Sequence, residues 1–481
     1  MKKIIISKLF LYRNRFIIGY LILGFIFAFL MFLLPNIAQR GLSQDEINSA
    51  TVSFGLSPSM ILEGNLIDLP YHILQKLSIL VFGLTPFAIK LPSVLIGLGL
   101  GFLLILLLNR WFKSNVSLLA SCLVILSTPF LFLSGSGTPL IMLVFWPTLL
   151  LWLGSKIQGE KRPKPLYCFV FAIMMLISVF TPYMLYFAIF CVLFVLFQPH
   201  LRFVIKNLPR LPFIITLLVL LIGFAILGIG IFHRPEVIPE LMFSKNFDSN
   251  LFFSNIVSAL SLVFSWHQSI ESVFLSPLIS LPLFAIILIG LFSTTKGFFA
   301  SRNSIASLLL VFCLIITGFN ADAIIFSILP CTILMAHGIK YLLEKWYGLF
   351  PENPYARISA LLPLTILFAL MVIPGLLQYS YGYRYNPAVA DRFSYNLSII
   401  NQNFKEGTLF VFDNLDFYKI LERSSDVKII NTLEEKNDRI AFLGKPEDLD
   451  EHYRLTQIIT SPMRDNSDII YLYTYTEKEG E

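Results

Sequence analysis

Long runs of hydrophobic residues, separated by short polar stretches, fill the first 380 positions of the chain. A helix needs roughly 20 apolar residues to cross the hydrocarbon of a bilayer. About eleven segments approach that length, namely 16–35, 87–109, 116–133, 138–154, 166–181, 183–198, 211–232, 273–293, 303–318, 322–342 and 358–377. The pattern predicts an all-α polytopic membrane protein with about eleven transmembrane helices.

The pattern changes near residue 380, after which charged residues become common and the hydrophobic runs are short. Residues 407–413 and 468–476 have the β-rich composition of strands, and residues 414–424 are typical of a helix between them. We therefore expect a transmembrane domain over 1–380 and a small extracytoplasmic α/β domain over 381–481. No glycine-rich phosphate-binding loop is visible in the second domain.

The composition and the placement of charge support a membrane location and an orientation. The chain is 56% hydrophobic and only 14% charged, and its mean hydropathy is +0.76. With a cytoplasmic N-terminus, the inner loops carry nineteen Lys and Arg residues, whereas the outer loops before residue 380 carry four. Basic residues prefer the cytoplasmic side. We expect a multi-pass plasma (inner) membrane protein, N-terminus inside and C-terminal domain outside. The net charge of +6 then reports topology and does not indicate nucleic acid binding.

All five cysteines lie inside predicted spans, so we expect neither an extracytoplasmic disulfide nor a cysteine metal site. The two longest outer loops, 36–86 and 233–272, carry most of the polar chemistry. Loops of this length are usually functional. The chemistry is therefore expected on the outer face.

Two adjacent acids, Asp45 and Glu46, follow the first span almost at once. Ser43 and Glu46 have the spacing of a capping box, which predicts a short amphipathic helix with Ile47 and Ala50 on its apolar face. Consecutive helical residues project about 100° apart. If Glu46 caps the helix, Asp45 faces elsewhere and is available for chemistry, although acids in a first turn also simply complement the helix dipole.

A second surface helix is predicted from Asp68, as its N-cap, to about Gly83. His72, Gln75 and Lys76 share its polar face. From the residue types alone, we expect this face to contact water or lipid headgroups. Thr85 and Pro86 then cap the second span. Lys90 lies one turn inside that span and either extends to the headgroups or pairs with an anionic lipid.

Several of these features together resemble the C-type membrane glycosyltransferases, and most closely the protein O-mannosyltransferase and aminoarabinose transferase group. They are the Asp-Glu pair after the first span, "DLPYHIL" at 68–74, and "LFG…FA-K-LPS…G" leading into the second span. The resemblance covers residues 15–115 well and the remaining spans more loosely. "FSILPCTILMAHGIKYL" at 326–342 is similar to the family's late Leu-Pro span.

The resemblance implies a reaction and roles for particular residues. It implies transfer of a hexosyl or pentosyl group from a polyprenyl-phosphate donor to a hydroxyl of a lipid, glycan or protein acceptor at the outer face. Asp45 would be the general base, and Asp68 the second loop acid that orients a divalent metal (Mg or Mn, with Asp45) or the donor phosphate. The expected substrate-binding residues are Glu46, His72, Lys76, Lys90, Arg234, Lys245 and His267.

The sequence also departs from the family pattern and leaves alternatives open. Relatives commonly carry Arg or Asp between the third and fourth spans, where this chain has "SGSGTP" at 134–139. The absence of cationic groups there favours a non-catalytic scaffold in envelope assembly as a rival. A transporter or flippase for a lipid-linked substrate is another, although no inverted repeat is visible. His267 and Glu271 are either an acid–base pair or a surface ion pair.

Overall fold

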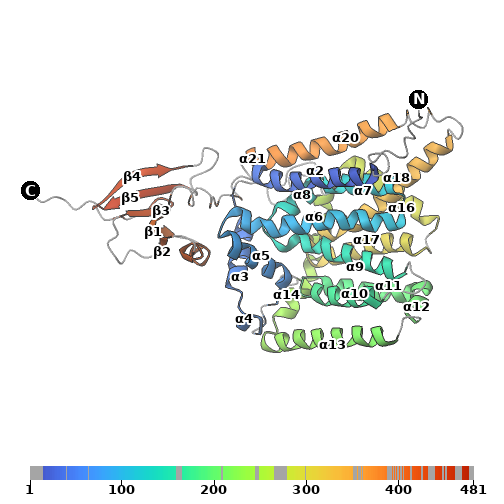
Figure 1. Cartoon of the computed structure of the whole chain (residues 1–481), viewed down its shortest axis with the longest axis horizontal. Helices are drawn as coiled ribbons and strands as arrows, with labels where there is room; N and C mark the ends of the chain where they lie inside the picture. The colour runs from blue at the N-terminus through green and yellow to red at the C-terminus, as the bar shows by residue number, and fades with distance from the viewer. Residues whose placement is uncertain are drawn as a thin grey trace, which may run out of the picture.

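A bundle of helices with a small β-sheet at one end makes up the protein (Figure 1). The computed structural model describes residues 15–38, 41–62, 64, 66–158, 165–206, 210–243, 249–264, 279–297, 300–349, 355, 359, 361–386, 393, 395, 397, 400, 404, 406–411, 414–423, 426–431, 439–446, 449, 452–460 and 469–475.

The helices follow the order of the predicted spans, with short helices added in the outer loops. Their bounds are α2 (Arg15–Ala38), α3 (Gln44–Gly55), α4 (Pro58–Leu62), α5 (Leu69–Phe82), α6 (Pro86–Trp111), α7 (Ser114–Ile125), α8 (Thr128–Gly135), η2 (Pro139–Ile141), α9 (Met142–Gln158), α10 (Pro165–Ser178), α11 (Met184–Phe197), α12 (Pro199–Lys206), α13 (Arg210–His233), α14 (Val237–Phe243), η3 (Ser249–Leu251), α15 (Phe252–Phe264), α16 (Leu281–Thr295), α17 (Ser301–Phe319), η4 (Ala321–Ser327), α18 (Ile328–Leu349), α20 (Leu361–Leu377), η5 (Gln378–Gly382) and α21 (Tyr383–Tyr385).

Helices coincide with or overlap each of the predicted spans, but fewer of them are long and apolar enough to cross a membrane unaided. In the described part of the chain four helical segments meet that test: 86–111, 139–158, 301–319 and 321–349. A fifth is counted if α7 and α8, which are bent by 64° at their junction, form one broken span. The protein is a multi-pass membrane protein. The count of eleven spans stays a prediction.

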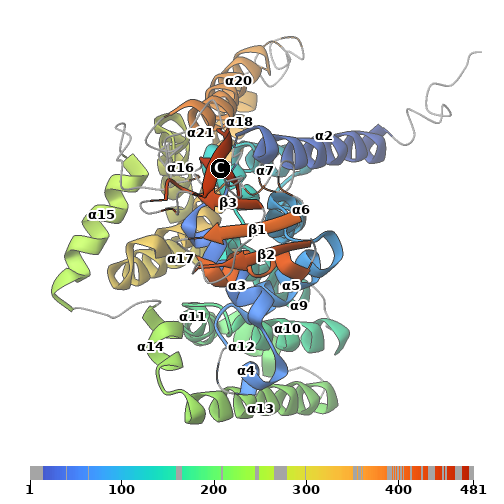
Figure 2. The ribbon, with the colours of Figure 1, turned by 90° about the vertical axis from the view of Figure 1, so that its left-hand side faces the viewer.

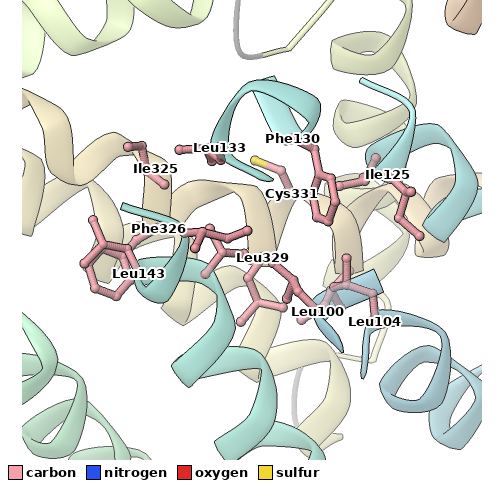
Figure 3. Close-up of a cluster of buried hydrophobic side chains, with 14 of the residues drawn as sticks. Leu100, Leu104, Ile125, Phe130, Leu133, Leu143, Ile325, Phe326, Leu329 and Cys331 are labelled. Carbon is pink, nitrogen blue, oxygen red and sulfur yellow. The ribbon is translucent and has the colours of Figure 1, made fainter. Parts of the chain in front are cut away.

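The bend between α7 and α8 has a local cause. Pro129 stands in the first turn of α8, where its missing N–H is tolerated, and it cannot continue α7. The Ser127 hydroxyl donates to the carbonyl of Val124 at 2.6 Å and so satisfies one of the last acceptors of α7. Residues of α8 remain buried in the centre of the bundle beside η4 and α18 (Figure 3).

Small residues bring α16 and α18 into close contact. A Cβ added at Gly290 would lie 1.9 Å from the carbonyl oxygen of Leu334, and one at Gly338 would lie 2.1 Å from that of Ile286. Helix pairs in membranes pack through such residues because lipid provides no hydrophobic drive for association. These glycines therefore fix the backbone separation of two core helices.

The C-terminal sheet has five strands in the order β2-β1-β3-β5-β4. Their bounds are β1 (Glu406–Val411), β2 (Asp426–Ile430), β3 (Arg439–Leu443), β4 (Tyr453–Ile459) and β5 (Ile470–Tyr475). β1 is parallel to both β2 and β3, whereas β5 is antiparallel to β3 and β4. The expected strands at 407–413 and 468–476 are present as β1 and β5. The expected helix at 414–424 is shorter, with α24 (Leu415–Tyr418) and a 3-10 turn η7 (Leu421–Arg423).

The sheet packs on the first outer loop, so that β1 and β2 lie in front of α3 and α5 when the bundle is viewed from its sheet end (Figure 2). One hydrophobic cluster joins the two parts, with Ile47 and Ala50 from α3 and Leu409 and Val411 from β1. The side chains of Gln44 and Asn414 exchange hydrogen bonds of 2.8 and 3.1 Å. The sheet therefore braces the helix that carries the two adjacent acids.

Candidate functional site

The N-terminus of α3 forms the capping box that its sequence predicts. The Ser43 hydroxyl accepts from the backbone N–H of Glu46 at 3.3 Å, and the Glu46 carboxylate accepts from the backbone N–H of Ser43 at 2.9 Å. Two otherwise unpaired donors of the first turn are satisfied in this way. The interpretation of Glu46 as the structural acid of the pair is thus supported.

Glu46 has further partners that come from distant parts of the chain. Its side chain is fully buried, and Oε1 accepts from the backbone N–H of Gly137 at 2.7 Å. The ammonium of Lys90 lies 3.7 Å from the same oxygen and also donates to the carbonyl of Gly41 at 3.2 Å. Lys90 is only 5% exposed, so the first of the two alternatives for it, extension to the headgroups, is wrong. Its charge is compensated inside the protein by Glu46.

The turn at 134–139, which carries no ionisable group, contributes its backbone instead. A Cβ at Gly137 would lie 2.7 Å from Cγ2 of Ile89 and 3.4 Å from Cγ of Glu46. Only a glycine brings the amide of this turn so close to the carboxylate without displacing its neighbours. The residues at this position therefore bind an acid of the protein itself.

Asp45 lies on the exposed side of α3, together with Asn48. Within the described residues its carboxylate has neither a hydrogen bond nor an ion pair. Gln44 beside it bonds both to Asn48, at 3.0 Å, and to Asn414 of the sheet. The two adjacent acids thus have opposite environments, as their 100° separation predicts.

The polar side of α5 faces α3 and is buried, which contradicts the expectation of a solvated stripe. Gln75 is fully buried: its Oε1 accepts from the hydroxyls of Ser49 at 2.9 Å and Ser53 at 2.6 Å. Its Nε2 donates to the carbonyls of Ile89 at 3.0 Å and Gly137 at 2.9 Å. All four hydrogen-bonding positions of the amide are therefore used. The exposed side of α5 is apolar, with Leu74, Leu77, Leu80 and Val81 among its residues.

His72 belongs to the same buried contact between α3 and α5. Its Nδ1 lies 2.7 Å from the hydroxyl oxygen of Ser53, whose proton is already donated to Gln75. We therefore assign the ring proton to Nδ1, where it donates to Ser53. Burial lowers the pKa of His72 to about 4. The ring is neutral at physiological pH. Lys76, a half-buried residue one turn on, donates to the backbone carbonyl of Leu56.

Asp68 stands at the N-cap position of α5, as expected, but its side chain makes no capping hydrogen bond. Its φ of 49° places it in the left-handed region, which Asp tolerates better than most residues. Its N–H donates to the carbonyl of Phe180 at 2.8 Å. Burial raises the pKa of the Asp68 carboxyl to about 7. A carboxyl with such a pKa can hold or release a proton near neutral pH, and perturbed groups of this kind gather at functional sites.

The second outer loop is described only in part. Arg234 follows α13 and is about one-third exposed; its guanidinium lies 2.9 Å from the carboxylate of Glu240 and 3.7 Å from that of Glu236. Lys245, His267 and Glu271 lie outside the described residues.

Two tyrosines at this end of the bundle are fully buried, which the sequence does not indicate. Tyr379, at the end of the last long helix, is fully buried, and its hydroxyl has no hydrogen-bond partner among the described residues. Tyr71 is also fully buried and exchanges a 2.8 Å hydrogen bond with Ser93. The aromatic segment 379–387 could be read as an interfacial belt, and only the fold reveals that Tyr379 and Tyr383 turn inward.

The described residues contain no cluster of three or more His, Cys, Asp or Glu side chains that could hold a metal ion. Asp45 and Asp68 could at most supply two carboxylate ligands. Mg²⁺ is often bound in this way, by one or two carboxylates with phosphate oxygens of a substrate completing its shell. Within the described structure no interaction links Asp45 with Asp68, so a divalent cation at either acid would depend on oxygen ligands from the substrate.

A sequence model of the family described as dolichyl-phosphate-mannose-protein mannosyltransferase matches residues 70–228 of the chain. That segment includes all but the first residue of α5, the whole of α6 and the turn at 134–139. No curated protein sequence matches the chain.

Solved membrane glycosyltransferases share the fold. ArnT from Cupriavidus metallidurans in the apo state has a TM-score of 0.55 and 12% identity, with 95% of this chain and 98% of ArnT covered. The same enzyme bound to undecaprenyl phosphate has a TM-score of 0.53 and 11% identity, with coverages of 96% and 98%. The archaeal oligosaccharyltransferase AglB from Archaeoglobus fulgidus, in complex with an inhibitory peptide and a dolichol-phosphate, has a TM-score of 0.51 and 11% identity.

The match to AglB covers 77% of this chain and 56% of AglB, so this chain spans little more than half of that protein. At such low identities the likeness establishes the fold. The resemblance to C-type membrane glycosyltransferases is thus confirmed in fold, and the family match adds sequence similarity over residues 70–228.

Proposed function

We propose that the protein transfers a sugar from a polyprenyl-phosphate donor to an acceptor hydroxyl at the end of the bundle that carries the sheet. The family match is to mannosyltransferases that use a dolichyl-phosphate sugar, and ArnT, with the same fold over nearly its whole length, has been solved with undecaprenyl phosphate. A lipid donor also accounts for the many apolar helices, because its prenyl chain stays in the bilayer.

The observation that carries the proposal is that the two adjacent acids have different environments, one buried and one exposed. Glu46 is buried and bonded to Ser43, Lys90 and Gly137, so that α3 is held firmly in place. Asp45 projects from that fixed helix with an exposed carboxylate. Pre-organised carboxylates on rigid elements are suited to general-base catalysis.

In this proposal Asp45 accepts the proton of the acceptor hydroxyl as the oxygen attacks C1 of the sugar. The new glycosidic bond forms while the bond between C1 and the phosphate oxygen breaks. The electron pair of that bond leaves with the polyprenyl phosphate. A positioned general base contributes about 10²–10⁴-fold to such a step.

The leaving phosphate requires a cation, and the described candidates differ in availability. Lys90 is committed to Glu46, and His72 and Lys76 join α5 to α3, so we assign these three residues to positioning. Arg234 is also ion-paired, with Glu240 and Glu236, but about one-third of its side chain is exposed, whereas Lys90 is buried. We assign the donor phosphate to Arg234, with Asp68 as the second acid of the site.

The proposal includes a divalent cation only if the substrate supplies some of the ligands of that cation. It would supply positive charge to the leaving phosphate. We expect EDTA to lower transfer in isolated membranes and Mg²⁺ or Mn²⁺ to restore it. Unchanged transfer in EDTA would exclude a loosely bound cation and leave Arg234 as the phosphate-binding group.

The decisive test compares variants in a host strain that lacks the gene, with envelope lipids and glycans measured by mass spectrometry. We expect Asp45→Asn to lower product by about 10²–10⁴-fold without changing the melting temperature of the purified protein. Asp416→Asn, at an exposed acid of α24, is the matched control and should retain full transfer. Glu46→Gln should instead lower the melting temperature, because it removes the carboxylate that pairs with buried Lys90.

Two outcomes would contradict the proposal. If Asp45→Asn and Asp68→Asn both leave the product unchanged, catalysis at this loop is excluded, and the non-catalytic scaffold becomes the better interpretation. Accumulation of a lipid-linked substrate across vesicles, without a covalent product, would instead indicate a transporter.

A further inference from the structure

A large apolar cavity lies at the end of the bundle opposite the sheet. It has a volume of about 480 Å³ and is bordered by the C-terminal part of α9, by α10, α11 and α12, and by the start of α17. Figure 1 places α11 and α12 at the end of the bundle far from the sheet. Its walls are mostly apolar, with Phe171, Met175, Phe190 and Phe194 among them. A cavity of this size accommodates a hydrocarbon chain.

Polar groups gather at one end of the cavity. Gln158 donates to the hydroxyl of Ser301 at 2.7 Å, which connects the C-terminus of α9 to the N-terminus of α17. Arg302 also lines the cavity, is exposed, and donates to the carbonyl of Trp111 at 3.3 Å. A cationic head thus stands where the apolar walls end.

Further positive charge surrounds this end. α12 is amphipathic: Leu201 and Ile205 line the cavity, whereas Arg202 and Lys206 are exposed on the same helix. Among the described residues the acid at this end of the bundle is Glu344, and it pairs with Lys340 at 3.8 Å. Basic pockets between transmembrane helices at a membrane surface bind anionic lipid headgroups.

We propose that this cavity binds an anionic phospholipid from the leaflet at the basic end of the bundle. An acyl chain lies between α9, α10 and α11, and the phosphate is bound by Arg302, with Arg202 and Lys206 adding charge. A second apolar groove, between α2, α6 and α7, provides a contrast. Its volume is about 560 Å³, yet none of its described lining residues is basic. Charge complementarity, and not volume, selects the first cavity.

The test uses purified protein with dioleoyl-phosphatidylglycerol or dioleoyl-phosphatidylcholine, and measures bound lipid by native mass spectrometry and melting temperature by tryptophan fluorescence. We expect phosphatidylglycerol to remain bound and to raise the melting temperature more than phosphatidylcholine does. Arg302→Gln should weaken phosphatidylglycerol binding roughly fivefold, the effect of one cation near a charged lipid surface. Lys345→Gln, an exposed cation of α18 outside the cavity lining, is the control.

A second variant tests the cavity itself. Gly154 lines it, and a Cβ added there would meet nothing within 4 Å, so Gly154→Leu fills the space without straining the backbone. Bound phosphatidylglycerol should be lost. Gly348→Leu, where an added Cβ also meets nothing, should bind as wild type does.

Equal retention of the two lipids, or unchanged binding in Gly154→Leu, would overturn the proposal. So would displacement of phosphatidylglycerol from the wild type by equimolar undecaprenyl phosphate, because the cavity would then be a prenyl-chain site. Asp45→Asn should bind phosphatidylglycerol as wild type does, so the lipid site and the proposed transferase activity fail or succeed separately.

Discussion

Two features of Asp68 lower the stability of the folded state: its left-handed backbone and its desolvated carboxyl. Each is of the kind that proteins retain at functional positions. With a pKa of about 7, the folded protein keeps the proton over a pH range in which the unfolded chain, with the ordinary value of 3.8, has lost it. The folded state therefore binds more protons, and its stability falls as pH rises through that range.

We predict that Asp68 makes the stability of the protein depend on pH, and that the Asp68→Asn variant loses this dependence. Between about pH 4 and 7 the wild type should lose of the order of 2–4 kcal/mol from this group. Asp68→Asn removes the titration and keeps a residue that tolerates a positive φ. Melting temperatures from pH 5 to 8 should therefore decline less steeply in the variant. Parallel curves would show that the carboxyl is ionised throughout.

At the residue scale, local chemistry could be predicted from the sequence and distant partners could not. The spacing of Ser43 and Glu46 predicts the capping box because both groups lie within one helical turn. The bonds of Glu46 to Gly137 and Lys90 depend on how three helices pack. The turn at 134–139 lacks charged side chains, and nothing in its composition indicates that a backbone amide serves an acid 91 positions earlier.

At the scale of elements, α5 begins and ends where the sequence predicts. Its buried and exposed faces, however, are the reverse of the prediction. The pattern predicts a polar side in water, because the rule for amphipathic helices assumes an aqueous surface. Here the polar side is buried against α3 and the apolar side is exposed, as befits a helix that faces lipid. Composition alone does not distinguish these arrangements, since both separate the same residues onto the same two faces.

Gln75 is the residue on which the buried contact between α3 and α5 depends. Gln75→Leu leaves the buried carbonyls of Ile89 and Gly137 without their donor, so we expect a loss of at least about 2 kcal/mol. The melting temperature of the purified protein measures it. Gln457→Leu, at an exposed glutamine of β4, is the control and should change little. If both substitutions have equal effects, the amide at position 75 does not hold α5 to α3.

At the scale of the whole molecule, the charge pattern predicts which end is cytoplasmic. The native cysteines among the described residues are buried or half-buried, so an added one can be labelled selectively. In intact cells, a membrane-impermeant maleimide should label Lys419→Cys near the sheet. It should label Gly348→Cys, at the basic end, only after permeabilisation. The reverse result would invert the proposed topology and move the candidate site to the cytoplasmic side.

The change of composition near residue 380 was enough to predict a separate α/β region, because strands and transmembrane helices differ so strongly in charge. The way that this region packs on α3 was not predictable. Gln44 and Asn414 are ordinary surface residues in sequence, and Leu42 pairs with Tyr395 only through a single isolated β-bridge. Such contacts are set by shape complementarity between parts that fold far apart in the chain.

The contact between Gln44 and Asn414 also has a consequence for biogenesis. The two residues are 370 positions apart, so at roughly 5–20 residues per second the ribosome needs about 20–70 s between them. During that interval Leu42, Ile47 and Ala50 have left the ribosome but lack the strands that later cover them. The helix that carries Asp45 is completed only when the last hundred residues have been made, so a chain truncated before the sheet has every span and an unfinished site.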